Sequence, residues 1–211
     1  MSETAKNSCV EYFKTFPPYA PGDFPIFGNV PVGRFTLDRL SRKLCQRGMS
    51  IKRVNQMLQG VRPTREAKII NLVCVQPADF GFLKGVPYKT LLKCASTNGL
   101  VLCPRETAFQ VFISEDTCGV PKKYFDFKEP QSKDVRAQPP VFLFASDPVD
   151  IATLSTAKGR IEKRESHIFG ICVAQGVMKL CVAHVAPQHE LSPDAFILFQ
   201  KVSTLSPRGG G

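Results

Sequence analysis

The stretch that decides the fold is TLDRLSRKLCQRGMSIKRVNQMLQG, residues 36–60. Its first half places leucines at helical spacing, at Leu37, Leu40 and Leu44. Gly48 is a natural stop for this helix, and Ser50 can cap a second one that ends at Gly60. The second half has its own apolar face, formed by Ile51, Val54 and Leu58. The sequence therefore predicts two short helices joined by a tight turn.

The charge of the chain is concentrated in the same region. The 211 residues hold 28 Lys and Arg against 18 Asp and Glu, a net charge of +10. Residues 34–68 contain ten of the basic residues and only two acidic ones, Asp38 and Glu66, so they carry +8 of that charge. A basic surface attracts nucleic acid, an anionic membrane or an acidic partner.

The segment Gly48–Gly60 is similar to the turn and second helix of a helix-turn-helix, in which the second helix reads base edges in the major groove. Five cations are the expected contacts to the phosphate backbone: Arg42, Lys43, Arg47, Lys52 and Arg53. Asn55 and Gln56 are the expected contacts to base edges. The alternative is an α-hairpin that packs its apolar stripe on a sheet and leaves its basic face solvated.

Beyond residue 67 the pattern changes to that of strands. Strand-like runs are interrupted by one helical segment, residues 87–97, with Asn98 and Gly99 as its stop. Residues 149–154 suggest a further short helix, and residues 115–140 hold four prolines and suggest a long loop. The predicted strands are residues 69–75, 100–103, 109–113, 141–145, 168–174, 177–185 and 195–202. These elements predict an α+β protein, in which a basic helical hairpin precedes a mostly antiparallel sheet with one main helix.

The chain divides into four parts by composition. Residues 1–33 interleave prolines with aromatic residues, which predicts an extended arm laid across a folded surface. Residues 34–66 form the basic helical hairpin, residues 67–204 the α+β sheet domain, and residues 205–211 a flexible tail.

The cysteines indicate a reducing compartment. None of the eight has the close spacing of a zinc knuckle or a redox motif, and most lie in apolar runs such as Leu72–Val75. The N-terminal residues Met1–Lys6 carry no apolar signal core. We therefore expect free thiols in a cytoplasmic protein, and we expect no membrane-spanning segment.

Motifs for several enzyme classes are missing from the sequence. There is no P-loop, no dinucleotide-binding glycine motif, no zincin helix and no nucleophile elbow. We expect no metal and no cofactor. The catalytic hypothesis that remains is a cysteine nucleophile with a histidine base on a neighbouring strand, for example Cys172 with His184.

Two further stretches carry a resemblance to a known group. Gly85–Leu92 and the tract Asn98–Glu106, with its Leu-Cys-Pro-Arg-Glu ending, resemble a family of small uncharacterised bacterial proteins. Its members share a Gly-x-x-Tyr segment, a helix and a Leu-x-Leu-Cys-Pro-x-Glu tract, and their last strand resembles Phe196–Lys201. The resemblance implies a compact α+β fold and supplies no catalytic residues.

The sequence as a whole favours a non-enzymatic binding protein that contacts nucleic acid through the basic helix pair, phosphates first. The alternative is a protein-interaction or assembly module that uses the aromatic arm or a sheet edge. A third hypothesis is the enzyme with a cysteine nucleophile.

Overall fold

The computed structural model describes residues 23–114, 141–154, 161–174, 177–186 and 189–202. Within these ranges the strands β1, β2, β10, β5, β7 and β6 form one sheet in that order, while β4 pairs with β10 and β8 with β7. The β5–β10 pairing is parallel, and the other pairings in this sheet are antiparallel. The predicted class, an α+β protein with a mostly antiparallel sheet, is confirmed.

The elements follow one another in a mixed order along the chain. They are β1 (Gly28–Val32), α2 (Leu37–Gln46), α3 (Ile51–Leu58), β2 (Lys68–Val75), η2 (Pro77–Phe80), β3 (Val86–Pro87), α4 (Tyr88–Thr97), β4 (Leu100–Val101), α5 (Thr107–Ile113), β5 (Val141–Phe144), β6 (Val149–Leu154), β7 (Ile161–Ala174), β8 (Val177–His184), β9 (Glu190–Leu191) and β10 (Phe196–Lys201). A small second sheet pairs β3 with β9.

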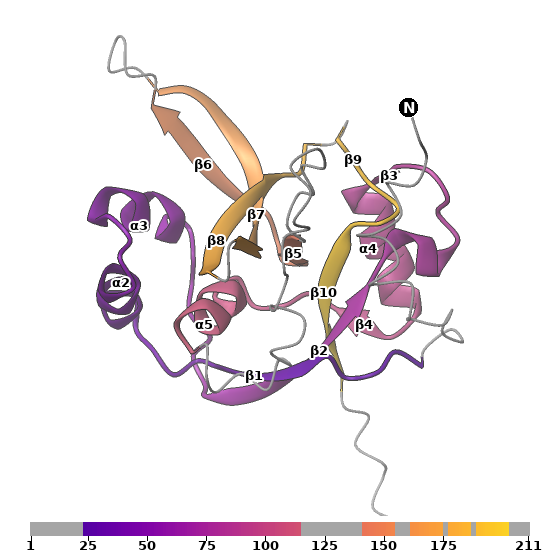
Figure 1. The fold of residues 1–211 in the computed structure, drawn as a ribbon, viewed down its shortest axis with the longest axis horizontal. Coiled ribbons are helices and arrows are strands. Elements are labelled where there is room, and N and C mark those ends of the chain that lie inside the picture. Colours follow the sequence, from indigo (N-terminus) through magenta and orange to yellow (C-terminus); the bar gives the residue numbers. More distant parts are fainter. Residues whose placement is uncertain (1–22, 115–140, 155–160, 175–176, 187–188, 203–211) are drawn as a thin grey trace, which may run out of the picture.

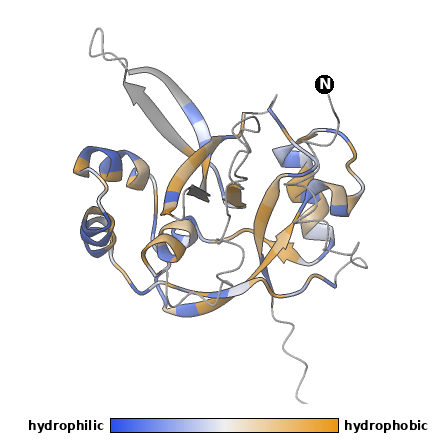
Figure 2. Ribbon diagram, in the orientation of Figure 1, coloured by the Kyte–Doolittle hydropathy of each residue, from blue (hydrophilic) through white to orange (hydrophobic). Residues whose placement is uncertain are grey.

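The sheet is buried on both faces because its central strands alternate between two apolar clusters. In β10, Phe196 and Leu198 belong to one cluster, while Ile197 and Phe199 belong to the other. Side chains of successive strand residues point to opposite faces, so an uninterrupted apolar run marks a strand that is covered on both sides. Figure 2 shows the apolar colouring of β10 and the polar colouring of α2 and α3.

The first face is covered by α5 and the helical pair α2–α3. Helix α5 contacts β1, β7, β8 and α2, so it lies between two parts of the curled sheet (Figure 1). Its residues Thr107 to Phe112 are all buried. The other face is covered by α4, whose Tyr88, Leu91 and Ala95 are buried in the second cluster.

Two sequence predictions were wrong. Residues 109–113 were expected as a strand but form most of α5, because a helix that is buried all round shows no polar face to reveal its period. Residues 149–154 were expected as a short helix but form β6, which pairs with the first half of β7. The sheet thus carries two helices, α4 and α5, where one main helix was expected.

The end of the proline-rich segment joins the body of the protein. Residues 28–32 form β1, which pairs with β2 and leaves Pro31 on an edge strand, where its missing N–H is tolerated. Phe24 and Phe27 are buried, so these two aromatic side chains pack inside the molecule. The predicted loop over residues 115–140 and the tail after residue 204 lie outside the described residues.

Candidate nucleic-acid interface

Each of the helices α2 and α3 begins with a side-chain cap, and the cap of α3, Ser50, is the one that the sequence predicted. The hydroxyl of Thr36 accepts a hydrogen bond from the Arg39 amide, and that of Ser50 accepts one from the Arg53 amide, both at 3.4 Å. Residues 47–50 connect the helices, and Gly48 adopts a left-handed φ of 86° within this turn. A four-residue turn that contains glycine is the connection typical of helix-turn-helix motifs.

Most of the apolar stripe of the pair is packed into the first cluster. Leu40 and Leu44 from α2 and Val54 and Met57 from α3 are buried there, alongside residues of α5 and the sheet. Leu37 and Ile51, which were predicted on the inner faces, are exposed, because both lie in the first turn of their helix. This packing orients each helix about its axis, so that Arg39, Arg42 and Lys52 are exposed. Both hypotheses for the pair, an interface or a solvated face, need this orientation.

The two ends of the helical pair are joined by a buried carboxylate. Glu106 is fully buried at the start of α5, and its Oε1 accepts hydrogen bonds from the Gly33 amide at 2.7 Å and the Thr64 amide at 3.1 Å. Gly33 precedes α2, and Thr64 follows α3. A side chain at Gly33, whose φ is 74°, would collide with the Glu66 carbonyl, so glycine lets the two chain segments meet.

The neighbouring Arg105 ties the end of α3 to the loop between β5 and β6. Its guanidinium donates hydrogen bonds to the carbonyls of Gly60, Asp147 and Pro148 at 2.9, 3.0 and 3.2 Å. Neither charge of the tract Cys103–Glu106 is fully exposed, because Glu106 is buried and Arg105 is half-buried. Burial also raises the pKa of the Cys103 thiol, which opposes reactivity.

Five of the seven predicted contact residues are exposed on the helical pair: Arg42, Arg47, Lys52, Arg53 and Asn55. Of these, Arg42, Lys52 and Asn55 form no side-chain hydrogen bond or ion pair within the described residues. Lys43 is half-buried, with its ammonium 5.3 Å from the centre of the Phe35 ring. Its charge is held in place by a cation–π contact, and no acid in the described part of the chain neutralises it.

The other predicted contacts are less free than the sequence suggested. The Arg53 guanidinium donates to the Leu180 carbonyl, and that of Arg47 donates to the Ile113 carbonyl, each at 3.3 Å. These bonds fix α3 to β8 and the α2–α3 turn to the end of α5. Gln56 is half-buried. The structure thus gives two of the five predicted phosphate contacts a role in holding the pair on the body.

Other exposed cations lie on or next to the helical pair and were not among the predicted contact residues. Arg39 is exposed on α2 and lies 4.9 Å from the centre of the Phe35 ring, on which Lys43 also packs. Four more exposed cations flank the base of the pair: Arg34, Arg62, Arg65 and Lys68. All are part of the +8 of residues 34–68, so the signal was present in the charge count. The charge count could not show which of these cations are exposed in the folded protein.

The catalytic pairing of Cys172 with His184 does not form. In the β7–β8 ladder Cys172 lies opposite Lys179, and His184 lies opposite His167, five residues along β7. At about 3.3 Å per residue this separation places them roughly 16 Å apart, far beyond hydrogen-bond reach. Burial raises the pKa of Cys181 to about 12 and that of Cys74 still further. None of these thiols is activated as a nucleophile.

The three histidines lie near one another: His167 in the middle of β7, His184 at the end of β8 and His189 just before β9. The rings of His167 and His184 have centroids 5.4 Å apart, and those of His184 and His189 are 6.0 Å apart. His167 Nδ1 is 2.7 Å from the Glu165 carbonyl oxygen. In the described part of the chain, no group of histidine, cysteine and carboxylate residues is arranged to hold a metal ion.

The described helices include none with the length and apolar composition of a membrane span. Comparison of the chain with protein-family models, with curated proteins and with solved structures finds no match.

Proposed function

We propose that the protein binds nucleic acid through α2 and α3, with contacts to phosphates as the main source of affinity. One observation carries the proposal: Arg39, Arg42 and Lys52 are exposed on the pair, and none of these three has a carboxylate partner among the described residues. Arg42 and Lys52 illustrate this on the two helices, and Asp38 forms no ion pair with either. Unpaired exposed cations on one surface are available to phosphates and release counterions when they bind them.

The exposed residues of α3 could contact the edges of bases. Asn55 is exposed one turn after Lys52, and Ile51 at the start of α3 is 59% exposed. In a helix-turn-helix the N-terminal residues of the second helix face the base edges, where an amide can pair with adenine and an apolar group can contact the thymine methyl. We therefore assign base contacts, where sequence is read, to Ile51 and Asn55.

The test uses two variants of equal charge change. Arg42→Gln/Lys52→Gln removes two cations from the pair, and Lys89→Gln/Lys93→Gln removes two exposed cations from α4 on the other face of the sheet. Arg47 and Arg53 are left intact because their carbonyl bonds hold the fold. Binding to a short duplex DNA and to an RNA hairpin is measured by fluorescence anisotropy over a range of salt concentrations.

The wild type is expected to bind with a steep salt dependence. The α2–α3 variant should bind more weakly, and the slope of log K against log salt should fall by about 2, because each lost phosphate contact removes close to one counterion. The α4 variant should match the wild type. Equal loss in both variants would mean that only net charge matters, and it would refute the assignment to the helical pair.

A further inference from the structure

A cavity of about 630 Å³ lies between α4 and the sheet, on the face opposite the helical pair. It is lined by Lys89, Leu92, Lys93, Ser96, Leu100, Val101, Leu102 and Phe199. This volume falls within the range of small-molecule sites, which are mostly apolar clefts with a few well-placed polar groups.

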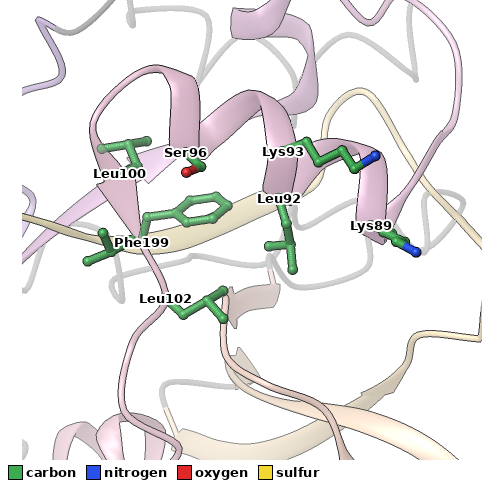
Figure 3. A pocket seen from close by; sticks show the side chains of 8 residues that line it. Lys89, Leu92, Lys93, Ser96, Leu100, Leu102 and Phe199 are labelled. Carbon is green, nitrogen blue, oxygen red and sulfur yellow. The ribbon is translucent and has the colours of Figure 1, made fainter.

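The floor of the cavity is apolar. Phe199 of β10 is 1% exposed and Leu100 of β4 is 2% exposed, so both side chains are held firmly by the second cluster. Leu92 of α4 and Leu102 after β4 are half-buried. Figure 3 shows the Phe199 ring beside Leu92 and below Ser96, with Leu102 farther from the ring. Phe199 and Leu100 expose almost nothing, so the apolar surface that a bound chain could cover belongs to Leu92, Leu102 and the 39% exposed Val101.

The rim of the cavity is cationic along one side. Lys89, Lys93 and Ser96 follow one another at helical spacing on α4, so they lie on one face of the helix (Figure 3). All three are exposed, and no carboxylate among the described residues pairs with either ammonium group. The site therefore offers two positive charges and a hydroxyl beside an apolar floor.

We propose that this cavity binds an amphipathic monocarboxylate, a medium-chain fatty acid in chemical class. Its carboxylate would lie between the ammonium groups of Lys89 and Lys93, and its alkyl chain would cover Leu92, Val101 and Leu102. The charge of the rim selects an anion, and the apolar floor selects a chain over a small polar acid. This site is separate from the helical pair and does not depend on nucleic-acid binding.

The experiment is isothermal titration calorimetry with three probes below their micelle-forming concentrations. Decanoate has the charge and the chain, decylamine has the chain with the opposite charge, and acetate has the charge without the chain. We expect saturable binding of one decanoate per protein and no saturable binding of the other two. Saturable binding of decylamine with comparable affinity would overturn the proposal, and so would the absence of decanoate binding.

The protein variants give an independent measurement. Lys89→Gln/Lys93→Gln should weaken decanoate binding about tenfold, from the loss of two partly solvated charge contacts. Arg42→Gln/Lys52→Gln, with the same charge change on the helical pair, should bind decanoate like the wild type. Both pairs change exposed side chains, so folding is checked by thermal unfolding. Unchanged binding in the α4 variant would refute the role of the rim.

Discussion

We predict that the buried carboxylate of Glu106 stabilises the packing of the helical pair on the sheet. Its Oε1 accepts the amides of Gly33 and Thr64 at 2.7 and 3.1 Å, and its side chain is fully buried. Glu106→Ala leaves both amides without this acceptor, at a cost of about 1–3 kcal/mol for each buried donor. Removal of a buried charge offsets part of that cost. We expect a net loss of about 2–4 kcal/mol in the free energy of unfolding.

Glu106→Gln separates the hydrogen bonds from the charge. The amide oxygen of glutamine can still accept from both N–H groups, so we expect this variant to lose about 1 kcal/mol or less. Urea unfolding followed by circular dichroism measures both variants. Hydrogen exchange should show faster exchange of the Gly33 and Thr64 amides in the alanine variant, and less change in the glutamine variant. Equal losses in the two variants would refute the clamp, as would unaltered exchange at these amides.

Two other predictions concern the second face of the molecule. The Tyr88 hydroxyl donates to the Ser146 carbonyl at 2.9 Å and accepts from the Ser146 amide at 3.0 Å. Tyr88→Phe should therefore lower the free energy of unfolding, measured in urea, by about 1–3 kcal/mol. A loss below about 0.5 kcal/mol would contradict this. Burial raises the pKa of Asp79 above its unfolded value, so its contribution to stability is complete below the unfolded pKa and is lost as pH rises through the folded pKa. The stability of Asp79→Asn should therefore rise relative to that of the wild type as the pH increases from about 4 to about 7. If the difference between their urea midpoints stays constant over this range, the pKa of Asp79 is not raised in the folded protein.

The elements that the sequence predicted well are those with one buried and one exposed face. Helix α2 shows Leu40 and Leu44 against a basic background and stops at Gly48, so its period and its end were both visible. Helix α5 had neither signal. Every residue from Thr107 to Phe112 is buried, the polar Thr107 and Gln110 included, so the helix has no exposed polar face from which its period could be recognised.

The contacts that hold the candidate interface could not be predicted from sequence patterns, because their partners are far apart in the sequence. Glu106 lies 73 residues from Gly33 and 42 residues from Thr64, and the Arg53–Leu180 bond spans 127 residues. No local periodicity encodes partners at such separations. The charge count located the basic region correctly, yet it could not distinguish Arg42, which points to solvent, from Arg53, which donates to a backbone carbonyl.

These long-range contacts determine how the proposed interface must behave. Helices of ten and eight residues are too short to be stable alone in water, so the basic surface exists only while α2 and α3 are packed against α5 and the sheet. Glu106 and Arg105 hold the pair at its ends, and both lie in the segment that leads from β4 into α5. The Leu-Cys-Pro-Arg-Glu tract therefore has a structural purpose: it joins the helical pair to the sheet. A change in this tract should weaken nucleic-acid binding through the position of the pair, without removing a single cation from its surface.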